Sequence, residues 1–155
     1  MKKVLLTESQ VRLITEEVDK NDSIQKLLFA DMSAIHFQKV ADMSAKSYSL
    51  IPVINGKKIS DKQVKLTVEE IKIKDKTLYQ LHIEVNYYIR RLGIAEKLFT
   101  AFILQGNPVC TMFSDMDEST NIMKGLWKKL SQNPQISVKK MKYNGKEVGI
   151  MGIKK

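Results

Sequence analysis

The chain has 155 residues, of which 26 are Lys or Arg and 17 are Asp or Glu, so its formal net charge is +9 at pH 7. This length suits one domain with its own core, and we expect a single domain over residues 1–155. The single cysteine, Cys110, excludes an internal disulfide, and no Cys/His cluster has metal-ligand spacing. We therefore expect a metal-free fold in a reducing, cytoplasmic setting, with Cys110 as a small buried hydrophobic residue.

The positive charge predicts an anionic partner, such as nucleic acid, a phosphorylated cofactor or an acidic protein surface. The lysines are scattered through "KIKDK", "WKKL", "VKKMK" and "IKK", and the chain carries no helix-turn-helix or ribonucleoprotein aromatic motif. A solvated basic surface is the better interpretation, so we do not expect nucleic acid as a partner. No apolar run reaches the roughly 20 residues of a membrane span, and we expect no membrane partner either.

The first quarter of the chain has the pattern of a strand and two helices. Residues 2–6, "KKVLL", are typical of a short strand, and "TESQ" after them has the form of a helix-capping box. Residues 24–43 then place Leu27, Met32, Ile35 and Val40 on one side of a second helix, with an interruption near Ser33. His36 lies within this helix, where we expect a histidine without a chemical role.

From residue 48 the hydrophobic period becomes that of strands. "SYSLIPVI", a turn at Asn55-Gly56, "QVKLTVEEIKI" and "TLYQLHIEV" predict an antiparallel meander. In its last strand the apolar residues from Tyr79 to Val85 alternate with the polar residues Gln80, His82 and Glu84. The two sets therefore point to opposite faces of the sheet.

The remaining elements are a helix at about 93–104, a strand "VCTMF", a helix at about 118–130 and a hairpin closed by Asn144-Gly145. The predicted order is β-α-α-β-β-β-α-β-α-β-β. It indicates an α/β (α+β) domain whose central sheet is mixed and mostly antiparallel, with about six to seven strands flanked by about four helices.

The stretch "YYIRRLGIAEKLF" lies where the meander's last strand passes into the next helix. The first backbone N–H groups of a helix lack intrahelical partners and carry the positive end of its dipole, so they attract phosphate oxygens. Gly93 and Ala95 would keep these amides accessible, while Arg90 and Arg91 would add charge. The alternative interpretation is a glycine that only lets the chain turn.

This stretch resembles the acyl-CoA pyrophosphate loop of the GCN5-related N-acetyltransferase (GNAT) superfamily, R/Q-x-x-G-x-G/A. Arg90, Gly93 and Ala95 match its defining positions, and Val85 matches the end of the strand that precedes the loop. The predicted element order is also similar to that of the superfamily. The resemblance implies acetyl-CoA or CoA as cofactor, held by Val85, Arg90, Arg91, Leu92, Gly93, Ile94 and Ala95.

The family resemblance implies two neighbouring strands that splay apart around the cofactor, and direct attack of a substrate amine on the thioester. It also implies a base that takes the amine proton, often through water. Glu84 is our first candidate for this base and His82 the second, since both lie on one face of the strand beside the loop. The alternative for both is an ordinary polar residue on the solvent side of a sheet.

The chain departs from the family in a later segment. The pattern N-x-x-A-x-x-L-Y-x-K-L-G-F aligns with "TNIMKGLWKKLSQ", so Trp127 stands where the tyrosine acid would be, and Thr120 stands in place of the asparagine. An indole N–H does not give up a proton at physiological pH. We expect Trp127 to be an amphipathic core residue.

The N-terminal segment from Lys3 to Val18 resembles K-x-L-T-E-S-x-L/V-x-x-I, which recurs in proteins of tailed bacteriophages. Two hypotheses therefore stand. The first is an N-acyltransferase that acts on an amine of unknown identity. The second is a catalytically inactive structural or adaptor protein of the same fold, such as a bacteriophage virion component that assembles with itself or with other subunits.

Overall fold

The computed structural model describes residues 22–86, 92–113 and 120–155. The strand expected at residues 2–6 and the helix expected after Thr7 lie outside these ranges. The described elements are α2 (Asp22–Phe29), the 3-10 turn η1 (Met32–Ala34), β1 (Ile35–Asp42), β2 (Ser47–Ile54), β3 (Lys57–Lys58), β4 (Val64–Ile73), β5 (Lys76–Val85), α3 (Ile94–Leu104), β6 (Val109–Met112), α4 (Thr120–Ser131), β7 (Ile136–Tyr143) and β8 (Lys146–Lys154).

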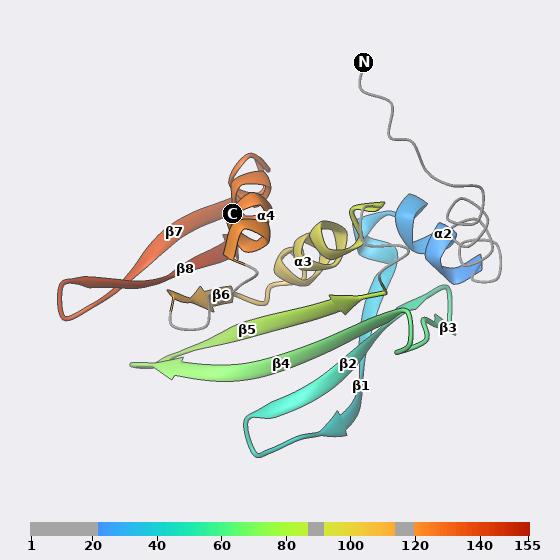
Figure 1. Cartoon of the computed structure of the whole chain (residues 1–155), viewed down its shortest axis with the longest axis horizontal. Helices are drawn as coiled ribbons and strands as arrows, with labels where there is room; N and C mark the ends of the chain where they lie inside the picture. The colour runs from blue at the N-terminus through green and yellow to red at the C-terminus, as the bar shows by residue number, and fades with distance from the viewer. Residues whose placement is uncertain (1–21, 87–91, 114–119) are drawn as a thin grey trace.

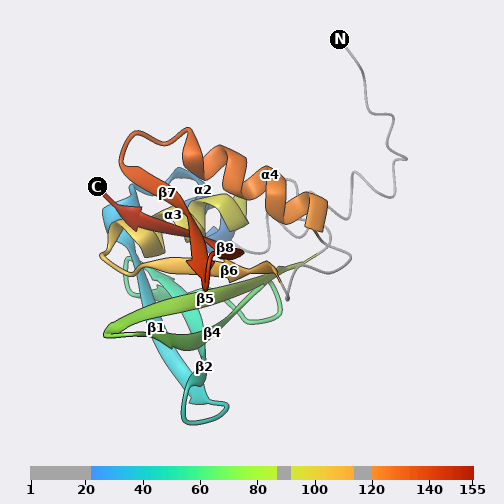
Figure 2. The same ribbon diagram turned by 90° about the vertical axis from the view of Figure 1, so that its left-hand side faces the viewer.

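The strands form one eight-stranded sheet in the order β1-β2-β4-β5-β6-β8-β7, with β3 paired to β2 beside this path (Figure 1). Every neighbouring pair is antiparallel except β5 and β6, which are parallel and joined through α3. The prediction of a mixed, mostly antiparallel sheet in an α+β domain is confirmed. Figure 2 shows α2, α3 and α4 on the same side of this sheet.

Two of the turns follow directly from Asn-Gly pairs. Asn55 and Gly56 have φ of 52° and 76°, and Asn144 and Gly145 have φ of 51° and 79°. Two successive residues with positive φ make the turn that matches the twist of a tight hairpin, and Asn-Gly is the pair that adopts it with least strain. Both hairpin turns were therefore predictable from two letters of sequence.

The prediction of a helix over residues 24–43 is wrong for the second half of this segment. It ends at Phe29, and residues 35–42 form β1, which pairs antiparallel with β2 from Ile35↔Ile54 to Asp42↔Tyr48. Ile35 is buried and Phe37 half-buried, while His36 is exposed, so the alternation is that of a strand. Pairing with β2 overrides the local helical period, because strand preference depends on the neighbouring strand. His36 is thus an exposed strand residue.

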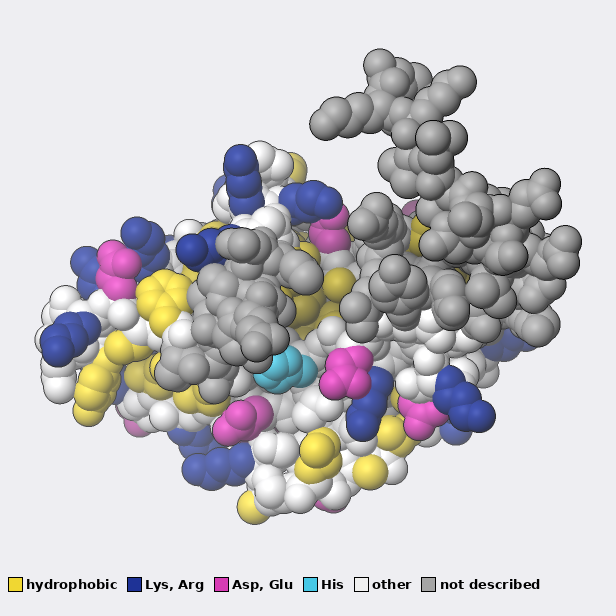
Figure 3. Space-filling view, viewed as in Figure 1, with side chains coloured by type: hydrophobic (Ala, Val, Ile, Leu, Met, Phe, Trp, Pro, Cys, Tyr) yellow, Lys and Arg dark blue, Asp and Glu magenta, His cyan; other side chains and the backbone are white. Residues whose placement is uncertain are grey.

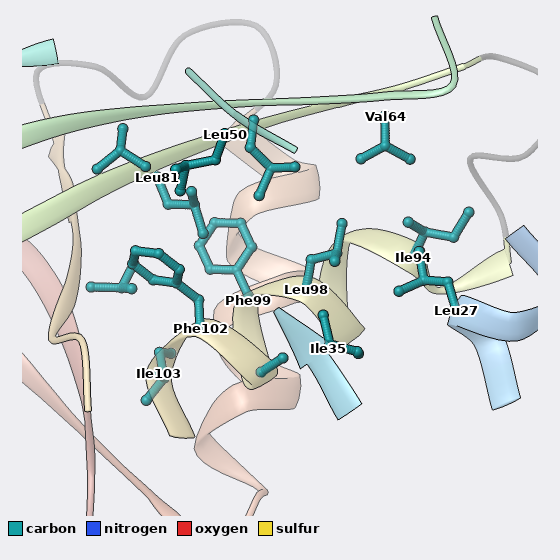
Figure 4. Close-up of a cluster of buried hydrophobic side chains, with 14 of the residues drawn as sticks. Leu27, Ile35, Leu50, Val64, Leu81, Ile94, Leu98, Phe99, Phe102 and Ile103 are labelled. Atoms are coloured by element: carbon teal, nitrogen blue, oxygen red, sulfur yellow. The ribbon is translucent and has the colours of Figure 1, made fainter. Parts of the chain in front are cut away.

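The main core lies between the helices and one face of the sheet, which we call the helical face. Figure 4 shows Leu98, Phe99 and Phe102 of α3 directed toward Leu50 and Leu81 of the sheet. Phe102 also makes edge-to-face contacts with Phe37 and Tyr79, with ring centroids 5.3 Å and 6.0 Å apart. Such pairs add to the stability that burial of the rings supplies.

A second, smaller cluster lies on the opposite face of the sheet. Leu78, Cys110 and Met141 are buried in it, and half-buried hydrophobic residues pack around them. Leu78 pairs with Ile71 of β4, and Cys110 pairs with Met151 of β8, so this cluster crosses the junction between β5 and β6. Cys110 is a buried residue, as the sequence predicts.

Candidate functional site

The parallel pairing of β5 with β6 is unusually short. It consists of Tyr79↔Val109 and Gln80↔Cys110, whereas β5 continues to Val85 and pairs with β4 over its whole length. Tyr79 N–H donates to Pro108 C=O over 2.9 Å, so its backbone faces β6, and every second residue after it faces the same way. The pair Gln80↔Cys110 uses the N–H of Leu81, so within the described residues the C=O of Leu81 and the backbone of Ile83 have no ladder partner on β6. We call residues 81–84 the open β5 edge.

Gln80 ends the ladder. Its side-chain Oε1 accepts a hydrogen bond from the backbone N–H of Met112 over 3.3 Å. In a continued parallel ladder that N–H would donate to the C=O of Leu81. Gln80 is 5% exposed and Met112 is half-buried, so the side chain satisfies a backbone donor that the divergence of the strands would otherwise leave without an acceptor.

The far end of the open β5 edge lies near the start of α3. Ile94 is fully buried in the same cluster as Val64, and Val64 is the residue of β4 that pairs with Val85. Figure 4 shows Ile94 and Val64 at the same end of this cluster. The open β5 edge, which spans roughly 13 Å for four extended residues, thus runs from Gln80 toward the first turn of α3.

Gly93 is the N-cap residue of α3 and has φ of 80° and ψ of 20°. Among the residues that the structure describes, no side chain caps this helix end, and none has an atom within 4 Å of a Cβ added to Gly93. A φ of 80° favours glycine, which agrees with the interpretation of Gly93 as a residue that lets the chain turn.

Neighbouring charges modify this helix end. Glu96 lies in the first turn, and its carboxylate is 3.7 Å from the ammonium group of Lys129 on α4. The pair offsets part of the negative charge that would oppose an anion, and it lies where α4 passes the first turn of α3. Leu92 is 40% exposed and Ala95 is half-buried. Arg90 and Arg91 lie outside the described residues.

The two candidate bases belong to the open β5 edge, and their side chains lie on the face opposite the helices. His82 pairs with Thr67 and Glu84 with Lys65, and both candidates are exposed. Tyr79, Ile83 and Val85, by contrast, are half-buried against the main core. The predicted alternation is confirmed for these residues, and the structure leaves both side chains accessible to a substrate on that face.

Trp127 is part of the core. It is 3% exposed, its indole Nε1–H donates to Oγ1 of Thr111 over 2.9 Å, and its ring lies edge-on to Phe99. A Cβ added to Gly152 of β8 would lie 3.0 Å from the indole, so the ring sits directly on that strand. The expectation of an amphipathic core residue is confirmed.

The sequence does not single out the partners that organise this region. Gln80 and Thr111 are buried polar residues whose partners come from 32 and 16 residues away. A polar residue between apolar neighbours in a strand is the only signal that either residue carries. That signal could mark a buried polar position, but it could not identify the partner.

No protein-family model, curated protein or solved structure matches this chain. Within residues 22–86, 92–113 and 120–155, no three His, Cys, Asp or Glu side chains are grouped so as to hold a metal ion. In the same part of the chain, no helix is both long and apolar enough to cross a membrane. Figure 3 shows Lys and Arg side chains spread over the visible surface instead of gathered in one cluster.

Proposed function

We propose that the protein binds an acyl-CoA, with the arm of the ligand along the open β5 edge and its diphosphate at the start of α3, and transfers the acetyl group to an amine. The observation that carries this proposal is the ladder between β5 and β6, which stops after two residue pairs. An unladdered edge offers backbone N–H and C=O groups to an extended ligand that contains amides. The uncapped first turn of α3 offers amides to phosphate oxygens.

The acyl-CoA supplies a thioester as acyl donor. The chain holds the arm along the C=O of Leu81 and the β6-facing backbone of Ile83, and it receives the proton that the attacking amine releases. Glu84 is the first acceptor for that proton, directly or through water, and His82 is the second. The amine nitrogen forms the new C–N bond as the C–S bond breaks, and the proton returns to the departing thiolate through water. Trp127 takes no part, since its N–H is held by Thr111.

Binding is tested first, by calorimetric titration of the full chain with CoA and with acetyl-CoA. Substitutions of Gly93 are poor probes, because a φ of 80° strains any side chain there. Ala95→Glu is better: it places a second carboxylate in the first turn of α3, which suits the helix dipole but repels a diphosphate. The matched control is Gln38→Glu on exposed β1.

The proposal expects heat with CoA, loss of most of it in Ala95→Glu, and wild-type behaviour in Gln38→Glu. A thiol-release assay over a panel of amines then tests transfer, with Glu84→Gln and His82→Gln as variants. Wild-type protein that gives neither heat nor thermal stabilisation with millimolar CoA would end the proposal.

A second candidate is a non-catalytic structural or adaptor protein of the same fold, such as a virion component. The burial of Trp127, in the position where the family has its tyrosine acid, favours this candidate. It predicts no thiol release with any amine. If CoA binds but no thiol is released, the protein has a CoA site without acetyltransferase activity.

A further inference from the structure

α4 and the β7–β8 hairpin border a hollow that the acyl-CoA proposal does not use. It is lined by Phe113, Lys124, Trp127, Lys128, Ser131, Val138 and Ile150, and its volume is about 280 Å³. Ligand pockets usually measure roughly 300–1,000 Å³, so this hollow suits a small ligand. It lies between α4 and the β7–β8 hairpin, on the helical face of the sheet.

The floor and the rim of the hollow differ in chemistry. Phe113, Trp127, Val138 and Ile150 present carbon surface, and Phe113 is 38% exposed beside it. Lys124 and Lys128 are exposed at the rim. The ligand that matches has an apolar body and a polar end that carries negative charge.

Lys124 and Lys128 together make a position between their ammonium groups that attracts a single negative charge. Residues four apart in a helix lie side by side, and like charges at this spacing repel. Neither lysine forms an ion pair with a residue that the structure describes; the pairs there involve Lys39, Lys129 and Lys140. An anion between the two ammonium groups would remove their repulsion and interact with both.

We propose that this hollow, the α4 pocket, is a binding site for a small amphipathic monocarboxylate, with the alkyl or aromatic body against Trp127, Val138 and Ile150 and the carboxylate between Lys124 and Lys128. A volume of about 280 Å³, just below the usual range of roughly 300–1,000 Å³, suits a short alkyl chain or a single aromatic ring. The α4 pocket lies on the β7 side of the helix, whereas the acyl-CoA proposal concerns α3 and the open β5 edge. The two proposals rest on different observations and are tested separately.

Trp127 reports on this site directly, because it is the only tryptophan of the chain and lines the pocket. Titration of the full chain with octanoate, followed by Trp emission and by calorimetry, measures occupancy. Octylammonium carries the same chain with the opposite charge, and acetate carries the same head group without the chain. The proposal expects a saturable emission change and heat with octanoate only.

One variant with a matched control locates the site. Ser131→Phe closes the mouth from an exposed position, and Gln132→Phe places the same ring on the adjacent exposed residue, which does not line the pocket. We expect about a ten-fold weaker octanoate response in Ser131→Phe and no change in Gln132→Phe. Thermal melting shows whether each variant is folded.

Charge is tested by Lys124→Gln with Lys128→Gln, against Lys139→Gln with Lys142→Gln on exposed positions of β7. Loss of two exposed lysines should weaken octanoate binding about five-fold, while the control pair should leave it unchanged. Absence of both heat and emission change with octanoate would overturn the proposal. So would equal binding of octylammonium, or an equal effect of the two phenylalanine variants.

Discussion

The carboxamide oxygen of Gln80 accepts a hydrogen bond from the backbone N–H of Met112 over 3.3 Å, at the position where the β5–β6 ladder would otherwise continue. The side chain thereby ends the ladder without leaving a buried donor unsatisfied. The bond joins the two strands immediately after their last residue pair, Gln80↔Cys110.

Gln80→Met should lower the free energy of unfolding by about 1–3 kcal/mol, since it keeps the length of the side chain but leaves the Met112 N–H without its acceptor. Urea unfolding measures this change. The Met112 amide should also exchange with solvent faster in the variant. An unchanged exchange rate would mean that the Met112 N–H finds another acceptor, such as the C=O of Leu81, and that Gln80 is not needed.

Trp127→Tyr should lower stability by about 2–3 kcal/mol, because a phenol leaves part of the indole's space empty and loses the bond to Thr111. Thr111→Val isolates the bond alone and should cost about 1–2 kcal/mol. Chemical unfolding of the two single variants and of the double variant gives the coupling. Additive effects would show that the indole N–H does not depend on Thr111.

The same Trp127→Tyr variant also discriminates between the proposed functions. In a working acetyltransferase the new phenol could raise turnover, whereas a structural protein would stay inactive in the thiol-release assay. An inactive, destabilised variant beside an inactive wild type would favour the structural candidate.

Two glycines should respond in opposite directions to substitution by alanine. A Cβ on Gly149 would lie 2.7 Å from the backbone oxygen of Thr111, so Gly149→Ala must push β8 away from β6 and should cost about 1–3 kcal/mol. Gly125 lies exposed within α4 with no atom near its Cβ position, and Gly125→Ala should stabilise the protein by about 0.5–1 kcal/mol. Thermal melting of the pair checks both signs.

Alkaline pH should destabilise the protein through Tyr48. Burial, together with the negative charge of Glu70 and the proximity of Tyr79, raises the pKa of Tyr48 above its usual value of 10.0. The folded state therefore keeps this proton where the unfolded state loses it. The stabilising contribution is complete below pH 10 and disappears as the pH rises through the folded-state pKa.

Tyr48→Phe should remove this part of the pH dependence, as urea unfolding at a series of alkaline pH values would show. Lys97 acts in the opposite direction in a similar range, because burial lowers its pKa, an effect that Asp31 partly opposes. The difference in unfolding free energy between wild type and Tyr48→Phe at each pH gives the contribution of Tyr48. If the unfolding free energy of the variant falls with pH as steeply as that of the wild type, another group causes the effect.

What could be predicted from the sequence depends on whether the information is local. The Asn55-Gly56 and Asn144-Gly145 turns and the helix after Gly93 are specified by adjacent residues, and these predictions are confirmed. The conformation of residues 35–42 is determined by the pairing of β1 with β2. The helical spacing of the apolar residues within this segment leads to the wrong prediction. The strand pattern can be recognised in "IHF" only when the partner is known.

The candidate site divides in the same way. The bare helix start at Gly93 and the alternation that exposes His82 and Glu84 are visible in the sequence. The hydrogen bond from Met112 to Gln80 depends on the register of β5 and β6, which precede and follow α3 in the sequence. The residues next to Gln80 do not determine that register. For the same reason, the contact of Trp127 with Thr111 could not be predicted.

The short β5–β6 ladder also bears on how the molecule opens. It divides the sheet into a β1-β2-β4-β5 half and a β6-β8-β7 half, each held by antiparallel pairs. The contact between the halves joins residues 30 positions apart, Tyr79↔Val109, but it consists of two residue pairs, whereas the antiparallel ladder between β6 and β8 has four. Each half should therefore protect its amides as a separate cooperative unit in native-state hydrogen exchange. Motion between the halves would change the width of the sheet at the open β5 edge while every antiparallel pair stays intact.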